Sequence, residues 1–395
     1  VGSPTVRVAA ILATTLLLAV ALAAAGVAGQ RLLAANDPIV VAADGSGDFA
    51  TLAEAVAAAA DGDEIRIRPG TYTEAVIIEK DLAISGDGPR DEIVISGHQD
   101  PELWAPGSDC GTSEPGSCAV VLNESATTLS GVTFSGSHSG LKIVGGSPTV
   151  SGVLFDHVGV PRSSGPADDG GLAMYIDQGS RAQILDNEFV ATADLSINGR
   201  AVPLIEGNTM RDGSQIMADD PGDETVIRAN EIIDAAAIAI NINAATRMLI
   251  EDNVVTGSGQ DAIQLGLFSA NGVEPIIRGN TISGSGGSAI NAVMGGAPTI
   301  EGNTFSDNAI GLLLGGFNQA QVLSNEISGD GSGITVARGS DPSITGNTID
   351  VTGIGITLGD GARSTLSGND VCGGDASISV HENAEPVMDD SNTTC

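Results

Sequence analysis

The chain has 395 residues, 42% of them hydrophobic and 17% charged, so it holds enough apolar material for a sizeable core, which argues against a disordered chain. Its 54 glycines and 3% aromatic residues indicate many tight turns with small side chains between them. The 50 acidic residues outnumber the 16 basic ones, and the net charge of -34 would repel the phosphates of nucleic acids, which are therefore not expected as partners.

The N-terminal segment carries the first predicted element. Residues 6–27 form an apolar run long enough to span a membrane, with Arg7 at its start and Arg31 after it. Small residues near its end also suit a signal-peptidase site, so a cleaved signal peptide and an uncleaved membrane anchor both stay open. Residues 1–36 are accordingly assigned to a signal or anchor with its linker, and the rest is expected outside the cell.

A short helix and the first strands are predicted next, within residues 37–97. The helix is expected over residues 49–61, because Thr51 and Glu54 have the spacing of a capping box and Gly62 follows as a stop. This helix would close the end of the structure that follows it. Alternating apolar residues then predict strands at 65–67, 76–78, 82–84 and 93–95.

Three segments in this region carry a family resemblance. They are DGSGDFATLAEAV at residues 44–56, IRIRPGTYTE at 65–74 and ISGDG at 84–88. Together they resemble the opening of pectin methylesterases and related pectate-lyase-like proteins, which implies a β-helix fold. The esterase's catalytic aspartate segment has no counterpart here, nor do the motifs typical of polygalacturonases or pectate lyases. The resemblance therefore implies the fold and no reaction.

An internal repeat fills residues 98–395. The motif apolar-x-x-Asn-x-apolar recurs about every 22 residues, and two earlier copies carry Val132 and Val153 in place of the asparagine. The asparagines of the motif are Asn187, Asn208, Asn230, Asn253, Asn280, Asn303, Asn325, Asn347 and Asn369.

Each repeat also contains a second alternating segment, such as residues 238–243, followed by a turn rich in glycine or proline. A repeat this short suits one turn of a solenoid and not a pair of helices. We therefore predict an all-β, single-stranded, right-handed parallel β-helix of about 12 coils with an N-terminal capping helix.

The repeated polar residues and the cysteines are interpreted as structural. Stacked amides at an inward turn can bond to one another and to turn carbonyls, so the asparagines are not expected to be catalytic. The four cysteines form two pairs that are local in sequence, Cys110 with Cys118 and Cys372 with Cys395. Two short-loop disulfides are expected, one on a surface loop and one at the C-terminal end.

The second segments of successive repeats, aligned on their inward aliphatic residues, predict two outward columns. The first column is Tyr175, Ser196, Met217, Asn241, Gln264 and Asn291, and it then turns to Leu313, Thr335 and Thr357. The second column is Asp177, Asn198, Asp219 and Asn243. From the two columns, the residues expected to bind substrate are Tyr175, Asn198, Asn241, Asn243, Gln264 and Asn291.

A long insertion and a short one are predicted to flank these columns. The spacing from Val153 to Asn187 leaves a protruding loop at 156–171, which contains Asp156, His157, Arg162, Asp168 and Asp169, and a smaller insertion spans 268–273. Together they would frame a groove over the columns.

The carboxylates of this region are the candidate catalytic groups. Asp177 and Asp219 stand two coils apart, about 10 Å between backbones, near the spacing at which two carboxylates flank a glycosidic bond and a water. Asp168 or Asp169 would replace either one. The same group is also of the type that holds Ca²⁺, the one cofactor that the sequence leaves open.

Two functions from different classes follow. The sequence favours an extracellular or cell-surface protein that binds carbohydrate, a cell-envelope component or another partner, or acts as a sensor ectodomain, because no complete catalytic motif is present. The alternative is a lyase, hydrolase or epimerase acting on acidic polysaccharides through the carboxylates of the middle coils. Few aromatic residues and few cations speak against the alternative.

Overall fold

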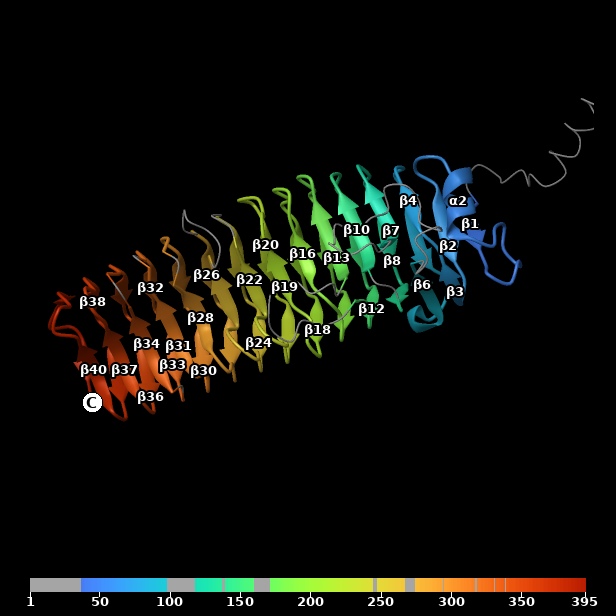
Figure 1. Cartoon of the computed structure of the whole chain (residues 1–395). Coiled ribbons are helices and arrows are strands. Elements are labelled where there is room, and N and C mark those ends of the chain that lie inside the picture. Colours follow the sequence, from blue (N-terminus) through green and yellow to red (C-terminus); the bar gives the residue numbers. More distant parts are fainter. Residues whose placement is uncertain are drawn as a thin grey trace, which may run out of the picture. The chain divides into compact units, whose positions relative to one another are not determined.

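The structure, a computed structural model, describes residues 37–97, 118–136, 139–159, 171–243, 247–266, 274–293, 295–316, 318–329, 331–337 and 339–395. Residues Ile39–Cys395 form one compact unit of short parallel strands. Figure 1 shows its strands stacked in sequence order along one axis, with the helix α2 at the N-terminal end. The all-β solenoid with a capping helix is confirmed.

Each coil contributes one strand to each of three sheets, here called A, B and C. Sheet A has 15 strands in the described chain: β1 (Ile39–Val41), β2 (Glu64–Ile67), β5 (Ala83–Gly86), β8 (Thr128–Ser130), β11 (Thr149–Ser151), β14 (Gln183–Leu185), β17 (Leu204–Glu206), β20 (Val226–Arg228), β23 (Leu249–Glu251), β26 (Ile276–Arg278), β29 (Thr299–Glu301), β32 (Gln321–Leu323), β35 (Ser343–Thr345), β38 (Thr365–Ser367) and β41 (Val387–Met388).

Sheet B has 14 strands in the described chain: β3 (Gly70–Thr73), β6 (Ile93–Ser96), β9 (Thr133–Ser135), β12 (Leu154–Asp156), β15 (Glu188–Val190), β18 (Thr209–Arg211), β21 (Glu231–Ile233), β24 (Val254–Thr256), β27 (Thr281–Ser283), β30 (Thr304–Ser306), β33 (Glu326–Ser328), β36 (Thr348–Val351), β39 (Asp370–Gly373) and β42 (Thr393–Thr394). A single 3-10 turn, η1 (Arg90–Glu92), precedes β6 in this part of the chain.

Sheet C has 13 strands in the described chain: β4 (Val76–Ile78), β7 (Cys118–Asn123), β10 (Ser139–Val144), β13 (Leu172–Asp177), β16 (Leu195–Ile197), β19 (Ile216–Ala218), β22 (Ile240–Ile242), β25 (Ile263–Leu265), β28 (Ser288–Ala292), β31 (Ile310–Leu314), β34 (Ser332–Val336), β37 (Ile354–Leu358) and β40 (Ala376–Val380).

The number of coils is larger than the 12 expected. With 15, 14 and 13 strands per sheet in the described residues, the solenoid has about 14 coils. The prediction was low because the asparagine motif marks the middle coils and not the first ones. The strands from β1 to β6 belong to coils that lack the motif. In the coil that follows them, the corner between sheets A and B carries Gly131 and Val132 in place of an asparagine corner.

The asparagine motif proves to be a sharp corner between two strands, so each coil has three strands and not two. The residue before each asparagine takes a left-handed backbone conformation, as at Asp186 (φ 53°) and Asp252 (φ 55°). The asparagine side chain points inward and each amide donates to the next, for example Asn187 Nδ2 to Asn208 Oδ1 at 3.0 Å. The ladder runs on to Asn392. The structural role predicted for these asparagines is confirmed.

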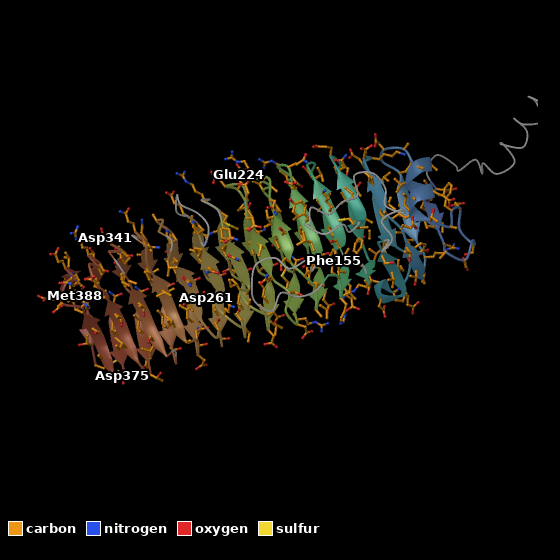
Figure 2. All side chains as sticks on the ribbon, viewed as in Figure 1. Phe155, Glu224, Asp261, Asp341, Asp375 and Met388 are labelled. Carbon is orange, nitrogen blue, oxygen red and sulfur yellow. A yellow bond between two sulfur atoms is a disulfide. The ribbon has the colours of Figure 1, made fainter. Side chains whose placement is uncertain are left out.

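Inward aliphatic residues stack in columns and form the core. Ile205, Ile227 and Ile250 of sheet A are fully buried and pair in register. In sheet B the inward column contains Phe134, Phe155 and Phe189, whose rings stack with centroids 5.2 and 4.7 Å apart. Figure 2 labels Phe155 within this core. Because every coil repeats the same inward positions, the outward positions are also aligned from coil to coil.

The capping helix is shorter than predicted. α2 spans Leu52–Ala58, and Thr51 caps it by accepting the amide hydrogen of Glu54. It does not reach Gly62, because Ala59 is already extended (ψ 155°) and the Lys80 ammonium takes the carbonyls that the last turn leaves free.

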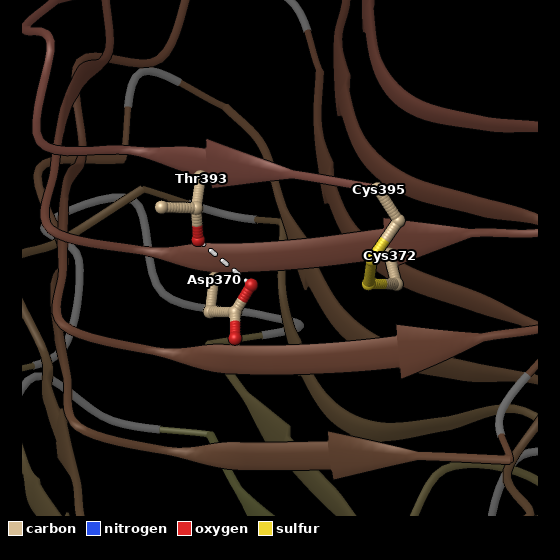
Figure 3. Close-up of a disulfide and its surroundings, with 4 residues drawn as sticks. All are labelled: Asp370, Cys372, Thr393 and Cys395. Atoms are coloured by element: carbon tan, nitrogen blue, oxygen red, sulfur yellow. Dashed lines mark hydrogen bonds between the residues drawn. A yellow bond between two sulfur atoms is a disulfide. The ribbon is translucent and has the colours of Figure 1, made fainter.

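The C-terminal coil is closed by a disulfide between Cys372 and Cys395, as predicted (Figure 3). Beside it Thr393 donates to the Asp370 carboxylate at 2.8 Å. Cys118 is also disulfide-bonded. Cys110 lies outside the described residues, as does the apolar run 6–27. In the part of the chain that the structure describes, no helix has the length and apolar character needed to cross a membrane.

Candidate functional site

Four segments of the chain connect strands of sheet C to the other sheets near the predicted site. Residues 98–117 and 160–170 link sheet B to sheet C, and residues 244–246 and 267–273 link sheet C to sheet A. All four segments lie outside the described residues, and with them Arg162, Asp168 and Asp169. The predicted walls of the groove therefore remain predictions.

The first outward column aligns as the sequence predicts. Strand pairing joins its members one to the next in the order Tyr175, Ser196, Met217, Asn241, Gln264 and Asn291, and then Leu313, Thr335 and Thr357. We call the outward surface from Tyr175 to Asn291 the polar face. Successive side chains on it are one strand spacing apart, about 4.8 Å.

The second column lies where the same strands end. Asn198, Asp219 and Asn243 continue the backbone hydrogen bonding of sheet C. The backbone amide of each donates to a carbonyl of the preceding coil at 2.8 to 3.1 Å. Asp177, at the end of β13, begins the column. These four residues therefore lie on successive coils at the ends of their strands, in the order predicted.

The candidate catalytic carboxylates Asp177 and Asp219 each accept a hydrogen bond from a different residue, one in the same turn and one on the next coil. Asp177 Oδ1 accepts the amide hydrogen of Gln178 at 2.7 Å, and Gly199 packs so closely that a Cβ there would lie 1.8 Å from that oxygen. Asp219 Oδ1 accepts from Asn243 Nδ2 at 2.8 Å. Asp177 thus supports its own turn, while Asp219 bonds to the next coil.

Three amides on consecutive coils carry unused hydrogen-bonding capacity. Asn241 and Gln264 are each only 7% exposed. The side-chain oxygens of these two residues and of Asn291 have no hydrogen-bond partner among the described residues. Asn291 Nδ2 donates to Asp261 Oδ2 at 2.8 Å, and Asp261 Oδ1 accepts the amide hydrogen of Ser288. Figure 2 labels Asp261 on this stretch. A buried acceptor without a partner costs about 1–3 kcal/mol, so a hydrogen-bond donor that reached this row would be stabilised there.

The structure adds a buried polar pair that the sequence analysis missed. Asp194 is 0% exposed and Gln215 is 4% exposed, and Gln215 Nε2 donates to Asp194 Oδ1 at 2.7 Å. They precede β16 and β19 at positions where the next coils have Ala239 and Ala262. The sequence carried one signal for this pair, because Asp194 and Gln215 occupy a column in which the next coils have small residues.

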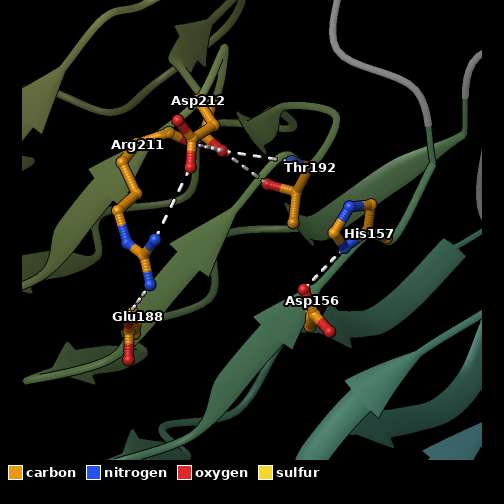
Figure 4. Close-up of polar contacts among 7 residues, drawn as sticks. Asp156, His157, Glu188, Thr192, Arg211 and Asp212 are labelled. Atoms are coloured by element: carbon orange, nitrogen blue, oxygen red, sulfur yellow. Dashed lines mark hydrogen bonds and ion pairs between the residues drawn. The ribbon is translucent and has the colours of Figure 1, made fainter.

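A second polar cluster lies on the outward face of sheet B (Figure 4). His157 is exposed in a left-handed corner after β12, and its Nδ1 lies 2.6 Å from Asp156 Oδ1. Glu188 lies between Arg211, at 2.6 Å, and Arg90. The hydrogen bond from Arg211, with Arg90 beside it, holds the pKa of Glu188 below its ordinary value. Glu188 is therefore ionised at neutral pH and is a poor proton donor.

The electrostatics of the polar face are acidic. The outward strand positions from Ser196 to Asn291 carry no lysine or arginine, and the nearest cation in the same column is Lys142, whose ammonium lies 5.9 Å from the Tyr175 ring centre. Within the described residues no three His, Cys, Asp or Glu side chains gather as they would around a metal ion. Asp168 and Asp169, which the calcium expectation includes, lie beyond those residues.

Comparison with known sequences supports the fold and the N-terminal resemblance. The family described as "Right handed beta helix region" matches residues 108–271 and 261–393, and the pectinesterase family matches residues 38–105. A pectinesterase of Daucus carota is 44% identical over 65 residues, which are 15% of this chain and 20% of that protein. The chain thus matches about a fifth of the length of this curated relative.

Several solved structures share the fold. The catalytic domain of an α-1,3-glucanase in complex with nigerose has a TM-score of 0.58 at 13% identity. The match covers 92% of this chain and 70% of the glucanase chain. A periplasmic alginate epimerase has 0.54 at 11%, with 84% and 76% covered. The A-module of a mannuronan C-5 epimerase of Azotobacter vinelandii has 0.52 at 15%, with 87% and 93% covered. At these identities the likeness is one of fold.

Proposed function

The chain belongs to the right-handed β-helix region family, and from this premise we propose that it binds an extended polysaccharide along the polar face of sheet C without cleaving it. One observation carries the proposal. The amides of Asn241, Gln264 and Asn291 lie in register on three consecutive coils, and their side-chain oxygens are buried without a partner in the described structure, so a ligand that reaches them would satisfy them. A regular row of hydrogen-bonding groups about 4.8 Å apart suits a polymer whose hydroxyl groups also repeat.

The charge of the face favours a neutral, hydroxyl-rich glycan over an acidic one. Asp177, Asp219 and Asp261 lie along the polar face, while the outward strand positions from Ser196 to Asn291 bear no cation. With a net charge of -34, the chain would repel a polyuronate at long range. The hydroxyl groups of a neutral sugar, in contrast, can donate hydrogen bonds to amide and carboxylate oxygens and carry no charge that these carboxylates would repel.

The disulfide supports a place outside the cell. Cys372 and Cys395 are joined, and such bonds persist in oxidising compartments. We therefore place the β-helix in the extracellular space, either secreted or held by the apolar run of residues 6–27. There it would serve as a carbohydrate-binding or sensing ectodomain.

An enzyme acting on polysaccharide is the second candidate. Asp177 and Asp219 stand about 10 Å apart along one column, which is near the range for two carboxylates that flank a glycosidic bond with a water. The glucanase and the epimerases that share the fold also act on polysaccharides, as their names state. Each carboxylate already accepts a hydrogen bond from the chain, Asp177 from Gln178 and Asp219 from Asn243, which makes this the weaker candidate.

Binding is tested by calorimetry with a set of neutral glucans, with alginate and with polygalacturonate. We expect a neutral glycan to bind, and the Asn241→Ala/Gln264→Ala variant to bind it at least about tenfold more weakly, a loss of about 1.4 kcal/mol. Thr335→Ala/Thr357→Ala is the matched control, because it alters the same column outside the polar face. Equal affinity of both variants, or no binding by the unaltered protein, would refute the proposal.

The same samples separate binding from catalysis. Release of new reducing ends or unsaturated products, abolished in Asp177→Asn/Asp219→Asn, would establish the second candidate instead. If the glycan binds and is recovered intact, the protein binds without cleaving.

A further inference from the structure

The outward face of sheet A carries an aliphatic stripe on four consecutive coils. Leu204, Val226, Leu249 and Ile276 pair in register, and Ile276 is 40% exposed while the other three are half-buried. The same column is polar immediately before and after, at Gln183 and Thr299. A contiguous apolar patch bounded in this way on a soluble surface indicates a contact site.

A ladder of alternating charge runs beside the stripe. Its members are Glu206, Arg228, Glu251 and Arg278, which occupy the same four coils. Arg228 bonds to Glu206 at 2.9 Å, and Arg278 bonds to Glu251 at 2.7 and 2.9 Å. These four residues have no net charge, although the same column continues at Glu301 and the whole chain carries -34. The general repulsion between two copies is therefore weaker where the stripe lies.

Stripe and ladder are both complementary to themselves under a two-fold rotation. An axis parallel to the strands, between β20 and β23, would place a second copy face to face with its coils in reverse order. Glu206 would then face Arg278 of the second copy, and Arg228 would face Glu251. The stripe would bring aliphatic residues together in the same way.

From this complementarity we infer that sheet A is a dimer interface whose occupant is a second, antiparallel copy of this chain. Closed two-fold dimers are the commonest oligomers, and their interfaces require a patch that matches itself in this way. β20 and β23 are the eighth and ninth of the 15 strands of sheet A, so the axis lies near mid-length and the two sheets overlap along most of their coils. The polar face belongs to sheet C and lies outside such an interface.

Sedimentation of the full chain over a range of concentrations tests the inference. We expect the mass to rise from 39.4 kDa to twice that value. Ile276→Glu should abolish the rise, because it buries an unpaired charge against the partner. Val254→Glu is the matched control, since Val254 is 42% exposed but lies on sheet B, and it should dimerise normally.

Two charge-reversal variants distinguish this arrangement from nonspecific association. Arg228→Glu and Glu251→Arg each place like charges opposite one another across the axis, so each variant alone should stay monomeric. An equimolar mixture should form heterodimers, because the altered residues then face each other with opposite charge. The inference would be overturned if the unaltered chain is monomeric or if Ile276→Glu and Val254→Glu dimerise equally well. It would also be overturned if the mixture of Arg228→Glu and Glu251→Arg stays monomeric.

Discussion

Removing one amide from the middle of the asparagine ladder should lower the free energy of unfolding by an amount that follows from the hydrogen bonds of that residue. Asn253 is fully buried, and its side chain donates to the carbonyl of Ile227 at 3.0 Å and to Asn280 Oδ1 at 2.9 Å. It also accepts from the backbone and side-chain nitrogens of Asn230. Asn253→Ala loses these four hydrogen bonds. At about 1 kcal/mol for each, the free energy of unfolding should fall by about 4 kcal/mol.

The end of the ladder supplies the control. Asn392 also accepts from both nitrogens of Asn369, but it is partly exposed, so water can replace its amide. Asn392→Ala should therefore cost only about 1 kcal/mol. Urea unfolding followed by far-UV circular dichroism gives both values as midpoints and slopes. If the two variants differ by less than about 1 kcal/mol, the ladder does not stabilise the coils in the way described.

Two further perturbations address charge and covalent closure. Because the pKa of Glu188 is lowered by Arg211 and Arg90, its stabilisation is present above its ordinary pKa of 4.5 and is lost as the pH falls through the lower value of the folded state. Glu188→Gln should therefore lower the urea midpoint at neutral pH and flatten the decline in acid; an unchanged decline would contradict this. Replacing Cys372 and Cys395 by serine opens a 23-residue loop and should cost about 3 kcal/mol, with faster hydrogen exchange in β39–β42 as the local signature.

Much of the site's layout could be predicted from the sequence because every coil repeats the same inward positions. The steps between coils vary, but aligning the repeats on their inward aliphatic residues gives the order from Tyr175 to Asn291. The inward asparagines were predictable for the same reason, since a polar residue repeated next to aliphatic ones needs partners inside the turn.

Other features required the packed chain, because distant residues decide them. Lys80 takes the carbonyls at the end of α2, so the helix ends before Gly62. The carboxylate of Asp177 turns back onto Gln178, although its position in the column gives no sign of this.

The sequence by itself determined the parallel solenoid, its outward columns and its C-terminal disulfide, since these depend on regular spacing along the chain. Only the tertiary structure decided which outward groups already have partners. Asp219 bonds to Asn243, whereas the oxygens of Asn241 and Gln264 have no partner in the described structure. The reason is physical: hydrogen bonds depend on side-chain direction and on neighbours from other coils, and a linear pattern records neither.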